Sequence, residues 1–176
     1  MLPIRLDTKE DTVNLKNKCK FEAGAIFKMT TNNLIAPCGM NCGICLGYLR
    51  TKNHCVGCWN EDEGKPSYCR VCIIKNCESL SRSESKFCYE CSKYPCRRLK
   101  QLDKRYRTRY DMSMIENLEF IKVNGLEKFK ERENGRWICP NCGAVLCVHR
   151  EFCLNCKAQY REKSFLWFKY KPFPVK

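Results

Sequence analysis

Apolar residues recur at helical spacing in the middle of this chain. Between residues 97 and 110 one stripe carries Leu99, Leu102, Tyr106 and Tyr110, with basic residues on both of its sides. Apolar positions three or four residues apart are typical of an amphipathic helix that packs by one face. We therefore expect a helix over residues 97–110.

The pattern predicts two more helices directly after it. Ser113-x-x-Glu116 has the form of a capping box, in which the serine side chain accepts from the backbone at the start of a helix. The inward positions of that helix are Met114, Ile115, Leu118 and Ile121. Gly125 is placed to end it, because glycine tolerates the left-handed backbone of a helix terminus. A further helix is expected over residues 126–133, and we assign both a scaffold role.

Before residue 97 the apolar pattern is weak, and cysteines are the most prominent feature of the sequence. The chain has 17 cysteines, many in pairs with two residues between them and glycine or proline nearby, which is typical of metal-binding knuckles. The candidate metal ligands in this stretch are Cys38, Cys42, Cys45, Cys55, Cys58, Cys69, Cys72, Cys77, Cys88, Cys91 and Cys96. Cys42, Cys45, Cys55 and Cys58 form one workable set, but the spacing leaves the pairing open. Ile44, Tyr48 and Leu49 predict one face of a short helix here.

A second metal signal follows the helices. Cys139 and Cys142 form one knuckle, Cys153 and Cys156 form another, and ten residues separate them. Two knuckles at that distance predict a β zinc ribbon. Cys147 and His149 lie between the knuckles and are not expected to bind the ion, since four thiolates already complete a tetrahedron. The roles of Cys19 and His54 stay open.

These signals predict a small metal-stabilised α+β fold, a Cys-rich multi-knuckle domain with short helices and a C-terminal β zinc ribbon. The expected parts are an N-terminal extension (1–33), a Cys-rich metal-binding domain ending in a basic helix (34–110), a helical connector (111–136), a zinc ribbon (137–163) and an aromatic, basic tail (164–176). We expect three to four zinc ions.

The charge pattern suggests a polyanionic partner. The formal net charge is +14, and three or four zinc sites of four thiolates each would reduce it to roughly +6 to +8. The candidate nucleic-acid contacts lie on the predicted basic helix: Arg97, Arg98, Lys100, Lys104, Arg105, Arg107 and Arg109. The tail interleaves aromatic residues with lysines, which suits base stacking and phosphate contact. We predict binding to nucleic acid, with RNA favoured, or to a ribonucleoprotein.

Other classes receive less support from the sequence. The start of the chain lacks the pattern of a secretory signal, and closely spaced cysteines are more often metal ligands in a reducing compartment, so we expect a cytoplasmic protein. The longest stretch without a charge, residues 29–49, is interrupted by polar residues, glycines and prolines, which argues against a membrane span. No set of residues for acid–base or nucleophilic catalysis is evident, so neither an enzyme nor a small-molecule substrate is expected.

The ordered cysteines resemble a known family. The positions that carry the resemblance are Ala36-Pro37-Cys38-Gly39 with Cys42 and Cys45, Cys55-x-Gly57-Cys58, Cys72-x4-Cys77, Cys88-x-x-Cys91 with Tyr94-Pro95-Cys96, Asn117-Leu118 with Gly125, and Cys139-x-x-Cys142-Gly143. This order resembles the Cys-rich prokaryotic family called domain of unknown function 3795, here with a C-terminal zinc ribbon. The resemblance covers roughly residues 34 to 156 and implies metal binding, with zinc the usual assumption.

Three alternatives stay open at this point. Cys38, Cys42 and Cys45 with one distant cysteine are also able to hold an iron–sulfur cluster for electron transfer or redox sensing. The second alternative is a radical enzyme that uses S-adenosylmethionine, because the spacing of these three cysteines is the one such enzymes have. Against it, Ile44 stands where those enzymes usually have an aromatic residue. A protein–protein adaptor without nucleic acid is the third alternative.

Overall fold

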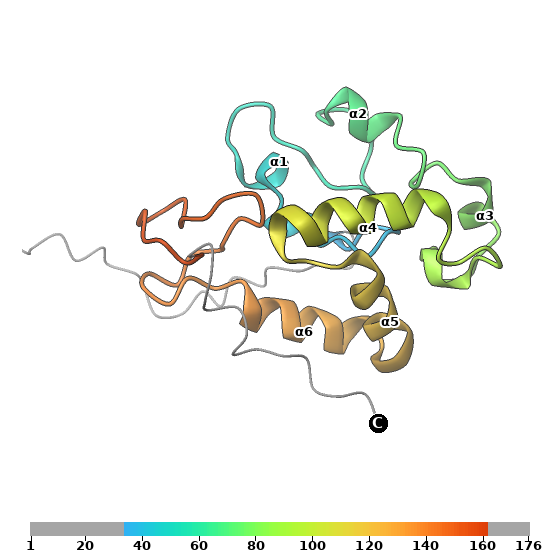
Figure 1. Ribbon diagram of the computed structural model, residues 1–176. Coiled ribbons are helices and arrows are strands. Elements are labelled where there is room, and N and C mark those ends of the chain that lie inside the picture. Colours follow the sequence, from blue (N-terminus) through green and yellow to red (C-terminus); the bar gives the residue numbers. More distant parts are fainter. Residues whose placement is uncertain (1–33, 162–176) are drawn as a thin grey trace, which may run out of the picture.

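The computed structural model describes residues 34–161 as a set of helices and knuckles (Figure 1). The elements in order are η2 (Cys42–Ile44), α1 (Leu46–Leu49), α2 (Ser67–Arg70), α3 (Glu78–Ser81), η3 (Cys88–Glu90), α4 (Arg97–Tyr110), α5 (Met114–Asn124) and α6 (Leu126–Arg136). The predicted N-terminal extension, the aromatic tail and the last two residues of the predicted ribbon lie outside the described residues.

The three long helices lie where the apolar pattern predicts them. Helix α4 spans the predicted residues, and α5 packs against both α4 and α6 (Figure 1). Leu99, Leu118 and Phe129 are fully buried, one from each helix, and so contribute to the core. The capping box is confirmed, because the Ser113 side chain accepts from the Glu116 backbone N–H at 3.0 Å. Gly125 ends α5 with φ +84°.

Asp103 fixes the corner between α4 and α5. Its side chain is almost fully buried and accepts from the Ser113 hydroxyl at 2.7 Å, the Ile115 backbone N–H at 3.0 Å and the Arg107 Nε at 2.7 Å. Burial acts to raise the pKa of Asp103, but these three donors outweigh it and the pKa lies below its usual value. The one acidic residue of the basic helix therefore orders the start of α5.

The turn at residues 36–40, which we call the N-terminal knuckle, packs onto α5 through a glycine. Gly39 has φ +83°, and a Cβ there would lie 2.7 Å from the Met114 carbonyl oxygen and 2.9 Å from the Leu118 Cγ. The Asn117 amide donates to the Gly39 carbonyl at 2.9 Å, and its oxygen accepts from Arg132 at 2.9 Å. Glycine is needed here both for the backbone conformation and for the close approach.

A buried polar contact joins the Cys-rich segment to α6. Asn41 accepts from the Gly43 backbone N–H at 2.9 Å, and its amide lies 3.3 Å from a carboxylate oxygen of Glu133. Glu133 is fully buried, so its pKa is raised, while Arg136 and Arg132 oppose that rise. These contacts tie the start of the described chain to the helical layer.

Two sequence predictions need correction. The expected short helix through Ile44, Tyr48 and Leu49 is divided, because Cys45 has an extended backbone between η2 and α1. The predicted β zinc ribbon is not confirmed, since residues 34–161 contain isolated bridges and no strand. Ile138 bridges to Val145 and Phe152 to Gln159. Each of these knuckles therefore has a single bridged pair at its base, whereas a strand needs a run of such pairs.

Candidate metal centre

Four cysteines near the C-terminal end of the described chain converge on one point. The Sγ atoms of Cys139, Cys142, Cys153 and Cys156 all lie within 4.8 Å of one another. The Cys139–Cys156 and Cys142–Cys153 sulfur distances are both 3.7 Å. A tetrahedral zinc ion with Zn–S bonds of about 2.3 Å places its sulfurs about 3.8 Å apart, whereas a disulfide needs about 2.05 Å. The group therefore fits one metal ion held by four thiolates.

The first of these knuckles is closed by two backbone hydrogen bonds. The Cys139 N–H donates to the Ala144 carbonyl at 2.8 Å, and the Cys139 carbonyl accepts from the Gly143 N–H at 2.8 Å. Gly143 has φ +72°. That left-handed residue reverses the chain directly after Cys142 and turns both thiols to the same side.

The second knuckle repeats this geometry fourteen residues later in the chain. The Cys153 N–H donates to the Ala158 carbonyl at 2.9 Å, and the Cys153 carbonyl accepts from the Lys157 N–H at 3.0 Å. Lys157 occupies the place of the glycine, with φ +62°. A non-glycine residue in this conformation is uncommon, and the hydrogen-bonded turn holds it there. We call residues 137–160 the knuckle pair.

Two asparagines support the thiols across the centre. The Asn155 amide lies 3.5 Å from the Cys142 sulfur, and this contact lowers the pKa of Cys142. A hydrogen bond from Asn141 is the main reason that the pKa of Cys156 is lowered to about 6. Burial instead raises the pKa of Cys139 to about 12. Each knuckle thus supplies a donor that favours a thiolate on the other knuckle, which suits metal binding because only thiolates act as ligands.

His149 joins the knuckle pair to the rest of the protein. Its Nδ1 accepts from the Leu46 N–H at 3.2 Å, and its Nε2 lies 3.1 Å from the Tyr106 hydroxyl. The neighbouring Val148 N–H donates to the Ile44 carbonyl at 2.9 Å. Burial lowers the pKa of His149 to about 4, so the ring is neutral at pH 7. Because Nδ1 accepts, the proton sits on Nε2 and points to Tyr106.

Cys147 and His149 both lie outside the four-cysteine group. Cys147 is fully buried and lies outside the four-cysteine group. Its carbonyl accepts from the Tyr160 hydroxyl, which comes from the far side of the second knuckle. Sequence reasoning found no role for His149, because its partners lie in α1 and α4.

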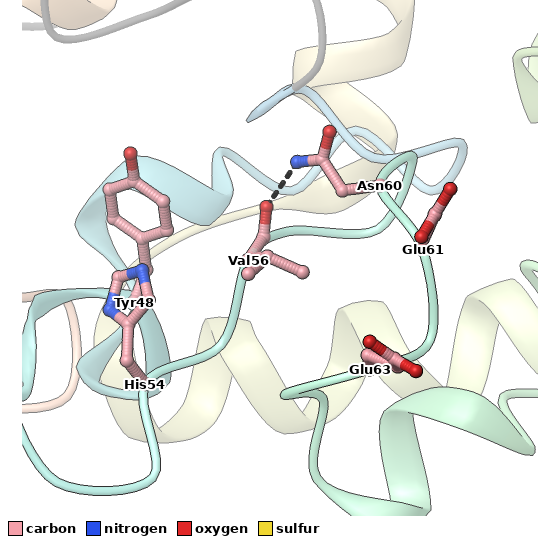
Figure 2. Close-up of a pocket in the computed structure, with 6 residues that line it drawn as sticks. All are labelled: Tyr48, His54, Val56, Asn60, Glu61 and Glu63. Atoms are coloured by element: carbon pink, nitrogen blue, oxygen red, sulfur yellow. Dashed lines mark hydrogen bonds between the residues drawn. The ribbon is translucent and has the colours of Figure 1, made fainter.

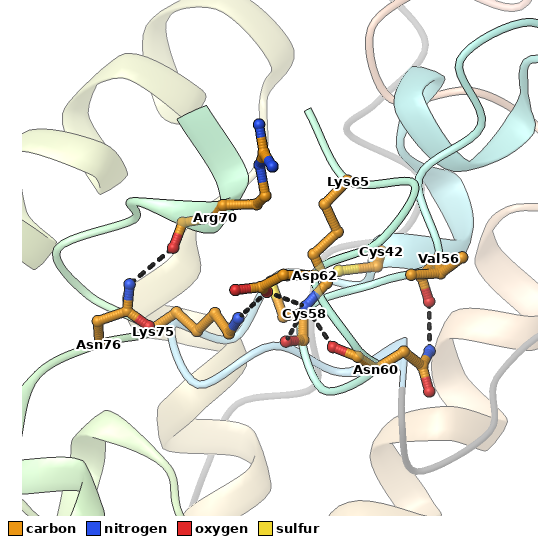
Figure 3. A network of polar contacts seen from close by, with 9 residues as sticks. All are labelled: Cys42, Val56, Cys58, Asn60, Asp62, Lys65, Arg70, Lys75 and Asn76. Atoms are coloured by element: carbon orange, nitrogen blue, oxygen red, sulfur yellow. Dashed lines mark hydrogen bonds and ion pairs between the residues drawn. The ribbon is translucent and has the colours of Figure 1, made fainter. Parts of the chain in front are cut away.

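Among the earlier cysteines, Cys42 and Cys58 form a close pair beside a network of lysine contacts (Figure 3). The sulfurs of Cys42 and Cys58 lie 3.8 Å apart. The Lys65 side chain is buried, and its ammonium donates to the Cys58 carbonyl and to the Asp62 carboxylate, both at 3.0 Å. The hydrogen bond with Cys42 and the lysine charges outweigh burial and lower the pKa of Cys58 to about 7.

The remaining candidate ligands divide into two neighbourhoods. Burial and the thiols of Cys55, Cys58 and Cys45 raise the pKa of Cys69 to about 12. Burial and the thiols of Cys96, Cys77, Cys91 and Cys72 likewise raise the pKa of Cys88 to about 12. Cys38 lies between these neighbourhoods, since Cys58, Cys88 and Cys72 all act with burial to raise its pKa. Within residues 34–161, no three of these eleven thiols meet the 4.8 Å distance that the knuckle pair meets.

The seven predicted nucleic-acid contacts are all exposed on α4. Arg107 is engaged in ion pairs, with Asp103 at 2.7 Å and Glu116 at 2.8 Å. Arg98 donates to the Ile73 carbonyl at 3.4 Å. The other exposed basic side chains on the helix are those of Arg97, Lys100, Lys104, Arg105 and Arg109.

An open surface hollow of about 520 Å³ lies beside α1 (Figure 2). His54 packs against Tyr48 with ring centroids 5.0 Å apart, while Glu61 and Glu63 lie on the opposite side. No cysteine is among the residues that line the hollow. Within the described residues His54 belongs to no group of closely spaced metal ligands.

Comparison with protein-family models, with curated proteins and with solved structures finds no match to this chain. In the part of the chain that the structure describes, no helix is long and apolar enough to cross a bilayer.

Proposed function

We propose that this chain is a zinc-binding scaffold protein that binds nucleic acid, with RNA favoured, or a ribonucleoprotein. The observation that carries the proposal is the convergence of Cys139, Cys142, Cys153 and Cys156 within 4.8 Å. Four thiolates in that arrangement suit zinc, and they leave no open coordination position for a substrate. A structural, non-enzymatic role follows from this ligand set.

The knuckle pair is placed to position the basic helix. His149 contacts the Tyr106 hydroxyl of α4, and its ring also lies edge-on to Tyr110, with centroids 4.8 Å apart. Metal binding at such a site is largely folding free energy. Ordering of the knuckle pair is therefore transmitted to the helix that carries the exposed arginines and lysines.

The charge on α4 supports a phosphate-binding surface. Arginine and lysine side chains that neutralise phosphates release counterions, so affinity falls as salt rises. We expect about three to five phosphate contacts from the exposed residues of the helix, which gives a log–log salt slope of about −2 to −4. The resemblance to the family of domain of unknown function 3795 and the cytoplasmic location remain predictions that accompany this proposal.

The test uses the full chain purified without oxygen, with its metal content measured. Binding to single-stranded RNA, duplex DNA and a neutral polymer is then compared at low and moderate salt. Replacing Arg98, Arg105 and Arg109 by Ala should weaken RNA binding and flatten the salt slope. The matched control replaces Lys52, Lys122 and Lys128, which are exposed outside α4, and removes the same charge.

Three results would contradict the proposal. Stoichiometric iron with visible absorbance would replace zinc by an iron–sulfur cluster. Equal weakening in both triple variants would show that only net charge matters. Undetectable binding to nucleic acid at low salt, with the metal retained, would favour a protein–protein adaptor.

A further inference from the structure

A small cavity lies beside the start of α4, and four cysteines line it. Cys77, Cys88, Cys91 and Cys96 come from three separate turns of the chain and border a volume of about 30 Å³. A cavity needs about 10–15 Å³ to admit one water, so an ion fits here. We propose that these four thiols bind a second metal ion of the zinc class, separate from the centre in the knuckle pair.

The local structure brings these four residues to the cavity. Cys77 directly precedes α3, Cys88 begins η3, and Cys91 ends η3 with its N–H donating to the Cys88 carbonyl at 3.2 Å. Cys96 is the N-cap residue of α4, where its carbonyl accepts from the Lys100 N–H at 2.9 Å. Four cysteines of which two, Cys88 and Cys91, are separated by two residues provide the ligand number and one of the close pairs that structural zinc sites use.

The rest of the lining explains why a metal ion suits this place. Ile74, Leu80 and Leu99 border the cavity and are buried. Thiolates beside such apolar walls are costly unless a cation accompanies them. A divalent ion displaces the four thiol protons and leaves a net charge of minus two. Arg98 also borders the cavity, and the positive end of α4 begins at Cys96, so both oppose that charge.

Metal binding at this cavity requires the cysteine side chains to move closer together. The four sulfurs do not lie as close together as those of the knuckle pair, which meet the 4.8 Å distance. A tetrahedral thiolate site needs sulfurs about 3.8 Å apart. Cys77, Cys91 and Cys96 are only partly buried, so rotation about their side-chain bonds is the movement that would bring the sulfurs together.

This second site anchors the other end of the basic helix. Cys96 holds the first turn of α4, whereas Tyr106, near its last turn, contacts His149 of the knuckle pair. The helix would then be fixed near both ends by metal-dependent structure. The inference stands on the cavity and does not depend on the binding of nucleic acid.

The test counts metal ions in the full chain and in four variants. Cys91→Ser and Cys142→Ser should each lose one metal equivalent, and the double variant should lose two. Ser92→Ala is the matched control, because it changes the exposed neighbour of Cys91 and should keep the full metal content. A Cys91→Ser variant that retains all of its metal would overturn the proposal.

A measurement on the unmodified chain covers the case in which Cys91→Ser fails to fold. Alkylation of each cysteine is followed by mass spectrometry while a chelator is added. Cys77, Cys91 and Cys96 should be protected at first and should become reactive together as the metal is removed. Reactivity of these three that is the same with and without chelator would overturn the proposal. Failure of RNA binding alone would leave this result unaffected, so the two proposals are tested separately.

Discussion

The Nε2 atom of His149 lies 3.1 Å from the hydroxyl of Tyr106, although the two residues are 43 positions apart. This hydrogen bond joins the loop between the two C-terminal knuckles to the basic helix α4. The same ring accepts from the Leu46 backbone on its other nitrogen. One neutral histidine therefore connects three parts of the fold, and the knuckle pair is docked on the helical core.

Loss of one ligand should release the C-terminal metal ion. We predict that Cys156→Ser lowers the metal content by one equivalent and removes amide-exchange protection mainly over residues 137–160, since the metal supplies most of the folding free energy there. Cys147→Ala is the control, because Cys147 lies outside the four-thiol group and its variant should keep the metal. Simultaneous loss of protection in α4, α5 and α6 would instead show that the chain unfolds as one unit.

Acidification should destabilise the fold through His149. Burial, with the charges of Arg150, Arg161 and Arg105, lowers its pKa to about 4 in the folded state, against 6.5 for the ordinary side chain. Between these values the unfolded chain binds the extra proton, so stability falls as pH drops from about 6.5 to about 4, by at most about 3 kcal/mol.

The measurement compares urea unfolding of the wild type and of His149→Phe at pH 7 and pH 5. The titration of the cysteine ligands is common to both proteins and is removed by taking the difference. The wild type should lose more stability than the variant over this interval. The exposed His54, replaced by Phe, is the control, and an equal loss in all three proteins would show that His149 does not contribute.

Asp103→Asn should weaken the corner between α4 and α5. The carboxylate accepts from Ser113, Ile115 and Arg107, and an amide replaces that charge with a group that keeps only part of this bonding. We expect a loss of about 1–3 kcal/mol at neutral pH. Because the pKa of Asp103 is lowered in the folded state, its contribution is present above the ordinary value of 3.8 and is lost as pH falls through the folded pKa.

The check on Asp103 is chemical denaturation at pH 7 and at pH 3. The difference between the wild type and Asp103→Asn should shrink at the lower pH. Asp111→Asn provides the comparison, since Asp111 is exposed with φ +48°, a conformation that asparagine tolerates well. A similar effect of both substitutions would argue against the special role of Asp103.

The sequence predicts the features of this fold that depend on local spacing. Leu99, Leu102 and Tyr106 recur at the helical period, and α4 has the predicted bounds. The capping box at Ser113 is a contact between residues three apart, so it too is visible in the sequence. The two C-terminal knuckles predict their four-thiol group for the same reason, because each knuckle is a local turn.

Features that depend on distant contacts were not predictable in this way. The buried carboxylate of Glu133 faces Asn41, which lies 92 positions earlier, and the helical pattern alone gives no sign of that partner. The spacing between Cys42 and Cys58 permits several pairings, and only the fold brings these two sulfurs to 3.8 Å. The expected β ribbon is not confirmed in residues 34–161, where isolated bridges such as that of Ile138 with Val145 are present and a strand needs a longer ladder.

Gly39→Ala should disrupt the contact between the N-terminal knuckle, residues 36–40, and α5. The backbone at Gly39 has φ +83°, and the added Cβ would lie 2.7 Å from the Met114 carbonyl oxygen, which is fixed within a helix. Strain and overpacking together should cost about 2–4 kcal/mol.

Gly135→Ala is the matched control, because Gly135 lies in α6. Apart from its chain neighbours and the backbone of its own helix, no atom lies within 4 Å of the new Cβ. Alanine there should stabilise the helix by about 0.5–1 kcal/mol. Thermal and urea unfolding of the two variants should therefore shift in opposite directions, and a Gly39→Ala protein as stable as the wild type would show that the knuckle does not pack on α5 as closely as described.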